Sequence, residues 1–295
     1  MLADPSGVSR RVLLASAAAT SVLAAAGGIL MATRGASLVE ANDLAAFRKP
    51  LDAIAVRVDA AIADGIIEGP APSFADAWKL LEPAGDGITD GVFARPDGGL
   101  VVACRTDMPG AIPEMWDWRM GWHGVSTERY KLWYPRDHVW SAFAEDRSHV
   151  RDVRACYVDN DTHVDEYIGP DLHKLTISFR PPGSFGQDPK LVDRQGAAIC
   201  PRTVLRNTPL NIGRLIRLVR RTDTGCEMLS RFWIGDVGFA VPLAGEVDIG
   251  SLQAPAQLRA LAPPVFGQHL LRHCAEGMNH LAMILPALFD KFGRI

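Results

Sequence analysis

A change of pattern at Pro263-Pro264 divides this sequence into a region of short strands and one long helix. After the two prolines, apolar residues recur at helical spacing, from Leu270 through Leu288, up to about Phe292. This spacing predicts a helix of many turns with one broad apolar face. Such a face must be buried against another layer of the protein, and the preceding residues have to supply that layer.

The residues before this helix have the pattern of an antiparallel sheet. The expected strands are short, β-branched or aromatic, and separated by turn residues; they span residues 91–95, 100–104, 154–158, 174–179, 197–205, 215–220 and 227–234. Pro96-Asp-Gly-Gly99, between the first two, predicts a β-hairpin. Strands and helices do not alternate, so a parallel α/β sheet is disfavoured. We expect an α+β fold in which a curved antiparallel sheet wraps the long C-terminal helix and a cavity lies between them.

A small helical part precedes the sheet. Between residues 37 and 66 apolar side chains recur at threes and fours, which predicts an amphipathic helix that Pro50 kinks or divides. Ser73-Phe-Ala-Asp76 resembles a capping box and predicts a short helix through Leu81. We expect residues 37–88 to form a cap or dimerisation element, and therefore a homodimer, because apolar helix faces usually find a partner. Residues 89–295 would form the main domain.

Residues 1–36 have the pattern of an export signal or membrane anchor. The pair Arg10-Arg11 precedes an uncharged run from Val12 to Met31, which is typical of export, and the paired arginines favour the twin-arginine route. The run is rich in alanine and therefore only weakly hydrophobic, so a signal is favoured over a permanent anchor, although the run is long enough to span a membrane. An uncleaved cytoplasmic helix is the remaining alternative.

The composition excludes several classes of function. The net charge is −3 without a basic block, which disfavours a nucleic-acid partner. The five cysteines are scattered without a C-x-x-C pair, so neither a disulfide framework nor a thiolate zinc site is indicated. No G-x-S-x-G motif occurs, which disfavours a serine hydrolase.

Candidate metal ligands come from three separate segments. An aromatic stretch from Tyr130 ends at His138, and Glu166 lies in an expected strand. On the last helix, residues 269, 273, 276 and 280 share one face and are His, His, Glu and His. A solvated face would more usually carry lysine and glutamate, so this polar stripe favours a cavity lining. Two imidazoles and a carboxylate are suitable ligands for zinc, whereas the alternative is a set of unrelated polar groups.

Several of these motifs resemble one known family. They are Met115-Trp-Asp-Trp118 through Trp122-His123, Arg129-Tyr-Lys-Leu-Trp133 to His138, Val164-Asp-Glu-Tyr-Ile-Gly169, Ser230-Arg-Phe-Trp233, and His273-Cys-Ala-Glu276 followed by His280. Between about residues 109 and 286 the chain resembles the diacetylphloroglucinol and phloretin hydrolases. The resemblance implies a zinc-dependent hydrolase that cuts the carbon–carbon bond between a phenolic ring and an acyl group. It also implies a Bet v 1-like helix-grip domain behind a small helical N-terminal part.

The resemblance also implies roles for individual residues. His138, Glu166 and His273 match metal ligands, and Tyr130 matches a residue that contacts the substrate. Zinc would polarise the acyl carbonyl of a small aromatic ketone or activate a water. Tyr130 is then the candidate for binding a ring hydroxyl and for assisting protonation of the ring carbon.

Three substrate-side positions differ from the family pattern. Gly277, Ser141 and Phe232 stand where the family has glutamate, asparagine and tyrosine. We therefore expect the fourth metal ligand to be Glu276 or a water, and the pocket to be less polar and larger. The missing glutamate leaves two alternatives open: a ligand-binding protein of the same fold that hydrolyses nothing, and a metal-dependent lyase or cyclase acting on a polyketide.

Overall fold

The computed structural model describes residues 42–147, 149–241, 245–248 and 263–293. By their internal contacts the residues fall into two units, Met1–Ala46 and Phe47–Ile295, and the sheet and the long helix belong to the second. The expected export signal, residues 1–36, lies outside the described residues. In the ranges that are described, no helix combines the length and the hydropathy needed to cross a membrane.

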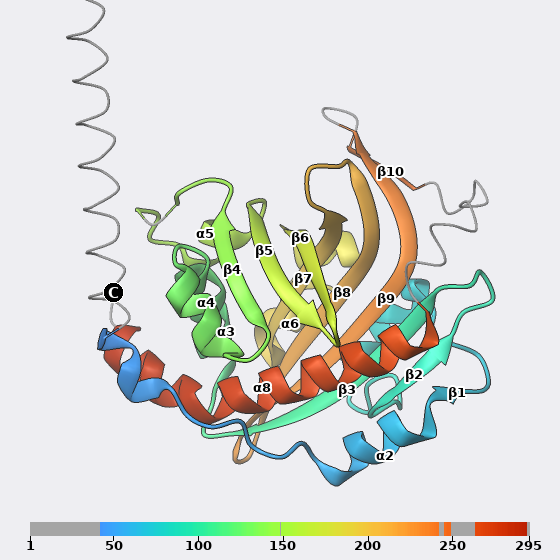
Figure 1. The fold of residues 1–295 in the computed structure, drawn as a ribbon, viewed down its shortest axis with the longest axis horizontal. Helices are drawn as coiled ribbons and strands as arrows, with labels where there is room; N and C mark the ends of the chain where they lie inside the picture. Colours follow the sequence, from blue (N-terminus) through green and yellow to red (C-terminus); the bar gives the residue numbers. More distant parts are fainter. Residues whose placement is uncertain (1–41, 148, 242–244, 249–262, 294–295) are drawn as a thin grey trace, which may run out of the picture. The chain divides into compact units, whose positions relative to one another are not determined.

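The larger unit is built on one curved, mixed sheet (Figure 1). Its strands are β1 (Ile66–Ile67), β2 (Gly91–Ala94), β3 (Leu100–Pro109), β4 (His138–Phe143), β5 (Asp161–Ile168), β6 (Asp171–Arg180), β7 (Gly196–Leu205), β8 (Leu210–Thr222), β9 (Gly225–Val241) and β10 (Gly245–Asp248). The strand order is β1-β2-β3-β9-β8-β7-β6-β5-β4, with β10 paired to β9. The described pairs are antiparallel apart from β1 with β2, which is a short parallel pair.

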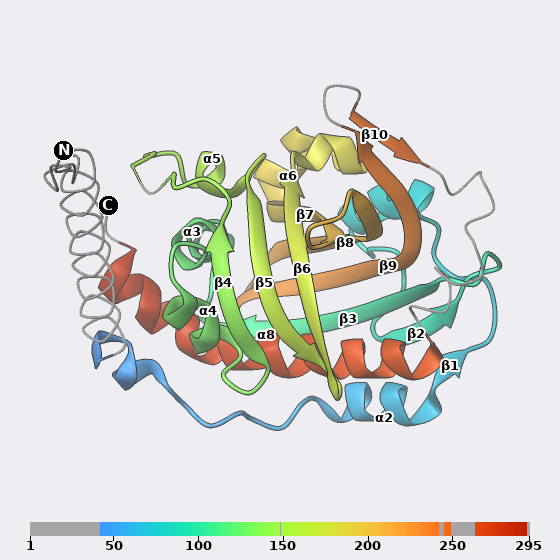
Figure 2. The same ribbon diagram turned by 45° about the horizontal axis from the view of Figure 1, so that its top comes forward.

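The helices of the larger unit are α2 (Val56–Asp64), η2 (Phe74–Leu81), α3 (Pro113–His123), α4 (Thr127–Trp133), α5 (Val153–Tyr157), η3 (Pro182–Phe185), α6 (Pro189–Gln195) and α8 (Pro264–Phe292), and the short helix η1 (Ala45–Phe47) spans the boundary between the two units. The long helix α8 packs along β3, and α2 packs beside α8, as Figure 2 shows. A large sheet curved around a C-terminal helix confirms the α+β class and is consistent with a helix-grip arrangement.

The outer face of the sheet carries a hydrophobic core of its own. Side chains alternate along β9, so that Trp233 and Leu229 face outward toward η2, η3 and α6. The ring of Phe74 on η2 meets Trp233 edge-on, with the ring centroids 5.1 Å apart. The Trp233 indole also donates a hydrogen bond to the Pro72 carbonyl, with 3.0 Å between nitrogen and oxygen. The apolar face of η2 is therefore covered by the chain's own sheet.

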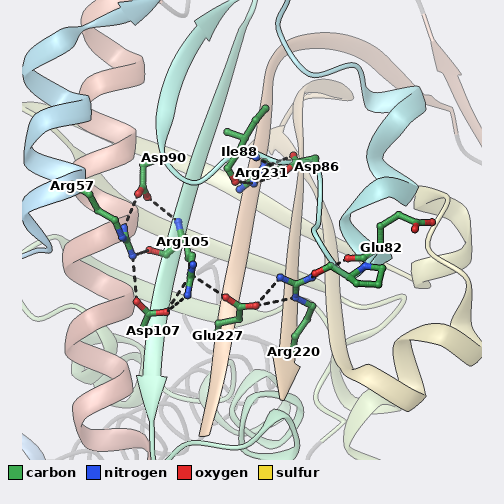
Figure 3. Close-up of polar contacts among 11 residues, drawn as sticks. Arg57, Glu82, Asp86, Ile88, Asp90, Arg105, Asp107, Arg220, Glu227 and Arg231 are labelled. Atoms are coloured by element: carbon green, nitrogen blue, oxygen red, sulfur yellow. Dashed lines mark hydrogen bonds and ion pairs between the residues drawn. The ribbon is translucent and has the colours of Figure 1, made fainter. Parts of the chain in front are cut away.

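Ion pairs join the outer face of β3, β9 and β8 to α2 and the segment before β2 (Figure 3). Arg231 of β9 is fully buried and donates two hydrogen bonds to the Asp86 carboxylate, at 2.7 and 2.8 Å. Arg57 of α2 reaches Asp90 at 2.6 Å, whose other oxygen accepts from the Arg105 backbone at 2.9 Å. Because a buried charge is costly without a partner, the Asp86 pair fixes the segment before β2 against the sheet.

Local turn and capping residues predicted several elements correctly. The hairpin of β2 and β3 forms around residues 96–99, and the long helix begins at Pro264. The short helix through Leu81 also forms, as the 3-10 helix η2, and the Ser73 side chain accepts a hydrogen bond from the Ala75 N–H.

Two predictions about secondary structure were wrong. Residues 154–158, expected as a strand, fall largely in helix α5, because Asp152 caps it by accepting hydrogen bonds from two backbone N–H groups. Helices α3 and α4 lie where only strands were expected. On α3 both Trp116 and Trp118 are buried, so the helix lacks one clear apolar stripe. By contrast, the expected division at Pro50 is confirmed in the described residues: residues 48–55 have no regular secondary structure, and helix α2 follows them.

Candidate metal centre and pocket

Three elements bring two histidines and a carboxylate together on the inner side of the sheet. His138 opens β4 and pairs directly opposite Glu166 of β5, and His273 projects from α8. One donor atom from each of these residues lies within 4.8 Å of the other two. The Glu166 Oε2 atom is 3.5 Å from His138 Nε2 and 3.9 Å from His273 Nε2. The three expected metal ligands are thus brought to one point.

A polar group lies on the far side of each imidazole, and each Nε2 atom faces Glu166. His138 Nδ1 lies 3.1 Å from the Tyr130 carbonyl, and His273 Nδ1 lies 3.6 Å from Asp137 Oδ2. A carbonyl only accepts hydrogen bonds, so His138 carries its proton on Nδ1 and keeps a lone pair on Nε2. Burial, and then the charge of His273, hold the pKa of His138 well below its usual value. This arrangement, ligand nitrogens backed by a carbonyl and a carboxylate, fits a zinc-type site.

Tyr130 lies against this cluster. Its ring stacks on His138 with centroids 3.9 Å apart and planes at 3°. Its hydroxyl donates a hydrogen bond to Glu166 Oε2 at 2.5 Å. Burial and the adjacent Glu166 raise the pKa of Tyr130 well above its ordinary value. The phenol therefore keeps its proton at neutral pH and acts as a donor.

Glu276 does not join the cluster, although it lies on the same helix three residues after His273. Its carboxylate accepts hydrogen bonds from the Tyr134 hydroxyl and from Arg136, and it lies 3.5 Å from Arg272. Two arginines and a tyrosine thus hold the carboxylate away from Glu166. This placement does not match the expectation that Glu276 is the fourth metal ligand. His138, Glu166 and His273 remain as the three candidate protein ligands at the cluster.

The cluster lies at the wall of a cavity of about 190 Å³ between the sheet and α8. Most of the lining is apolar, with Val164, Leu175, Ile199 and Leu270 among the contributors. Gly277, four residues after His273 on α8, also lines the cavity.

Two of the three residues expected to bind the substrate line the cavity, and the third does not. Tyr130 and Phe232 line the cavity. Ser141 is 3% exposed, lies on β4, and is not among the lining residues, and its hydroxyl has no hydrogen-bond partner in the described part of the chain.

Two polar groups of the site were missed in the sequence. Asp137, which faces His273, precedes a predicted ligand and has no pattern of its own. Arg217 lines the cavity from the middle of β8. Side chains alternate between the two faces of a strand, so Arg217 shares a face with Leu215 and Val219. An arginine between these two apolar residues could have indicated a polar group in the cavity.

Comparisons with known proteins agree with this geometry. A family model described as the DAPG hydrolase PhiG domain matches residues 71–290. A 2,4-diacetylphloroglucinol hydrolase from Pseudomonas protegens is 26% identical over 234 residues, covering 75% of this chain and 74% of that protein. A second 2,4-diacetylphloroglucinol hydrolase, from Pseudomonas sp., is also 26% identical and covered to 78%. A phloretin hydrolase from Eubacterium ramulus is 31% identical over 228 residues, 73% of this chain and 77% of that protein.

Proposed function

Because this chain belongs to the DAPG hydrolase family, we propose that it hydrolyses the carbon–carbon bond between a phenolic ring and an acyl group. Its relatives are named as hydrolases of 2,4-diacetylphloroglucinol and phloretin, which are phenolic ketones. The observation that carries the proposal is the convergence of His138, Glu166 and His273 beside Tyr130, at the wall of an apolar cavity. An apolar cavity with a few converging polar groups suits a small aromatic ketone.

We infer that the metal is zinc. Two histidine nitrogens and one carboxylate form the ligand set typical of catalytic zinc, in which a further position stays open. A zinc ion bound there would supply Lewis acidity for a carbonyl or a water. Because Glu276 is held by Arg136 and Tyr134, the proposal assigns the open position to solvent or substrate.

The reaction also needs a proton at the ring carbon, and we propose that Tyr130 delivers it and regains a proton from the attacking water. Hydrolysis adds the OH of a water to the acyl carbon and a hydrogen to the ring carbon, giving a carboxylic acid and a shorter phenol. A ring hydroxyl next to the acyl group lets the ring ketonise, so that its carbon can accept the proton. The raised pKa of Tyr130 keeps its hydroxyl protonated, and its hydrogen bond to Glu166 fixes its direction.

The substrate is proposed to differ from 2,4-diacetylphloroglucinol. Phe232 offers the cavity a ring edge without a hydroxyl, and Ser141 is not among the residues that line it. A lost hydrogen bond to a substrate hydroxyl removes about 0.5–1.5 kcal/mol of binding. A ring with fewer hydroxyls or a bulkier acyl chain should therefore bind better. If 2,4-diacetylphloroglucinol were the best of a broad panel, this part of the proposal would fail.

Two measurements test the proposed function. Protein purified without chelator should contain about one zinc per chain by elemental analysis, the ratio that a single three-ligand site requires. The same protein should release a carboxylic acid from acylphloroglucinols, dihydrochalcones or simpler aryl ketones. Stoichiometric metal with tight binding of these ketones but no acid release would identify a ligand-binding protein instead.

The remaining proposals concern the fold family and the assembly. We propose that the larger unit is a Bet v 1-like helix-grip domain that assembles as a homodimer, and that the arginine pair at residues 10 and 11 directs export. Light scattering that gives the mass of one chain would refute the dimer. Secretion that survives replacement of both arginines by lysine would refute the twin-arginine route.

A further inference from the structure

Arg217 brings a positive charge to the wall of a mostly apolar cavity. It lies on the inner face of β8, where its neighbours across the strands are Ile199 of β7 and Ser230 of β9. Only 9% of the residue is exposed, and it lines the same cavity as Tyr130 and Glu166. The cavity therefore holds a buried guanidinium close to the candidate metal centre.

No described residue accepts a hydrogen bond from this guanidinium. Its Nε atom is buried without a partner, and no carboxylate among the described residues forms an ion pair with it. Its nearest defined neighbours are aromatic: its Cζ atom lies 5.1 Å from the Trp133 ring centroid and 5.9 Å from that of Phe232. Arg231, on the outer face of the next strand, is fully buried but has the Asp86 carboxylate as its partner.

A buried charge of this kind needs compensation. Removing a guanidinium from water is costly, and contacts with aromatic faces offset only part of that cost. Cys274 and then Glu166 are the acidic groups that act most strongly on Arg217 electrostatically, but among the described residues neither accepts a hydrogen bond from it, and the Glu166 oxygen is already engaged by Tyr130 and faces the two histidines. The donors of Arg217 therefore remain available to an anion that enters the cavity.

We propose that Arg217 binds an ionised ring oxygen of the substrate, so that the cavity accepts an acylphenol as its phenolate. This inference rests on the proposed function and names the charge state that the site selects. An acyl group ortho or para to a hydroxyl withdraws electrons and makes that phenol more acidic, so such substrates ionise readily. The phenol O–H bond breaks on binding, its proton goes to solvent, and its electron pair stays on the oxygen that faces Arg217.

The chemistry of the ring supports this assignment. An ionised oxygen raises the electron density at the ortho and para ring carbons, one of which carries the acyl group and must accept a proton. A charge-assisted hydrogen bond from a guanidinium is also stronger than one between neutral groups. Because Phe232 offers no hydroxyl, Arg217 is the polar side chain that β8 and β9 contribute to the lining and that can recognise a ring oxygen. The cavity therefore selects a ring whose oxygen is ionised, instead of being less polar throughout than the family's pocket.

The test uses 4-nitrophenol, because its phenol and phenolate forms absorb at different wavelengths. The ligand is titrated with pH when bound to the wild-type protein and to Arg217→Lys, Arg217→Met and Leu215→Met. The last variant changes a side chain on the same face of the strand, two residues away, without changing charge. Metal content is measured in every preparation, and only preparations with equal content are compared, because a bound metal can also bind a phenolate.

We expect the bound ligand to ionise at least one pH unit lower in the wild-type protein and in Leu215→Met than in Arg217→Met. Arg217→Lys should lie between them. The affinity for the phenolate should fall at least tenfold in Arg217→Met, whereas 4-nitroanisole, which has no ionisable hydroxyl, should bind all four proteins within threefold. Equal ionisation of 4-nitrophenol in the wild-type protein and in Arg217→Met would overturn the inference.

The proposed function is tested separately from this result. If the wild-type protein releases acid from acylphenols but its ligand ionises independently of Arg217, the function stands and the inference fails. If it releases no acid but binds the phenolate through Arg217, the proposed function fails and the assignment of Arg217 as an anion anchor stands.

Discussion

Asp137 should control how tightly the candidate site holds its metal. Its carboxylate Oδ2 lies 3.6 Å from His273 Nδ1, and its other oxygen accepts a hydrogen bond from Arg136 Nε at 3.1 Å. A carboxylate behind a histidine ligand fixes the ring and makes its metal-binding nitrogen more basic. Replacing such a partner typically weakens metal binding about 10–100-fold, which corresponds to about 1.4–2.8 kcal/mol. We expect Asp137→Asn to lie in this range.

The pH of the measurement matters, because protons compete with metal for His273. Burial opposes the charged imidazolium, but Asp137 and Glu166 outweigh it and raise the pKa of His273 above its usual value. Metal affinity should therefore fall as the pH drops through this raised pKa. Asp137→Asn removes one cause of the raised pKa, so the fall should move to lower pH. At about pH 8, well above the ordinary histidine pKa, proton competition is small. The difference in metal affinity between the wild-type protein and Asp137→Asn at pH 8 therefore reports the lost orientation and basicity of His273.

Competition with a chromophoric chelator measures the dissociation constant at pH 8. Glu276→Gln is the matched control, because it neutralises a neighbouring acid that also contacts Arg136 but does not contact His273. We expect its dissociation constant to stay within threefold of wild type. An unchanged constant in Asp137→Asn would refute the role of Asp137. A loss in Glu276→Gln as large as in Asp137→Asn would show that Glu276 is a ligand after all.

Three further changes test other parts of the site and fold. Tyr130→Phe should lower kcat about 100-fold or more while leaving metal content unchanged; steady-state kinetics showing only a higher KM would contradict a role in proton transfer. Gly277→Glu should tighten metal binding at least tenfold in the chelator assay, because its Cβ would meet Tyr134 Cγ at an ordinary 3.4 Å and its carboxylate would face the cavity; an unchanged constant would contradict this. Arg231→Met should reduce the free energy of unfolding in urea by about 3 kcal/mol, because it leaves the Asp86 carboxylate without its partner. Burial alone would raise the pKa of Asp86, but the contacts with Arg231 outweigh burial and hold this pKa below its normal value. The stabilisation should therefore be complete above the normal carboxyl pKa and be lost as the pH falls through the lowered pKa. A wild-type-like urea midpoint of Arg231→Met at pH 7 would contradict the prediction.

Local chemistry explains which elements could be predicted from the sequence. A turn such as Pro96-Asp-Gly-Gly99 specifies a hairpin within a few residues, and Ser73 specifies the start of η2 through one side-chain hydrogen bond. The long helix α8 needs no more than its own apolar spacing. The β-branched and aromatic residues of β8 and β9, bounded by turn residues, likewise predicted strands.

The misses depend on contacts between residues far apart in the chain. Residues 154–158 have β-branched and aromatic side chains, but an Asp152 cap and burial against α3 favour a helix. The tryptophans of α3 face both the sheet and the neighbouring helices, which removes the periodicity that reveals a helix. Helix spacing placed Glu276 on the correct face, but spacing does not show that Arg136, 140 residues earlier, would bind its carboxylate.

The two halves of the site are fixed by different means, and this has a consequence for substrate choice. His138 and Glu166 are paired residues of adjacent strands, so the β4–β5 register sets their separation, and the packing of α8 sets that of His273. A shift of that register by one residue would turn one of the two side chains to the other face and separate them. By contrast, Arg217 and Phe232 are single side chains on the inner face of β8 and β9. Substitution at these two positions leaves the strand pairing unchanged, so the substrate can change while the metal centre is kept.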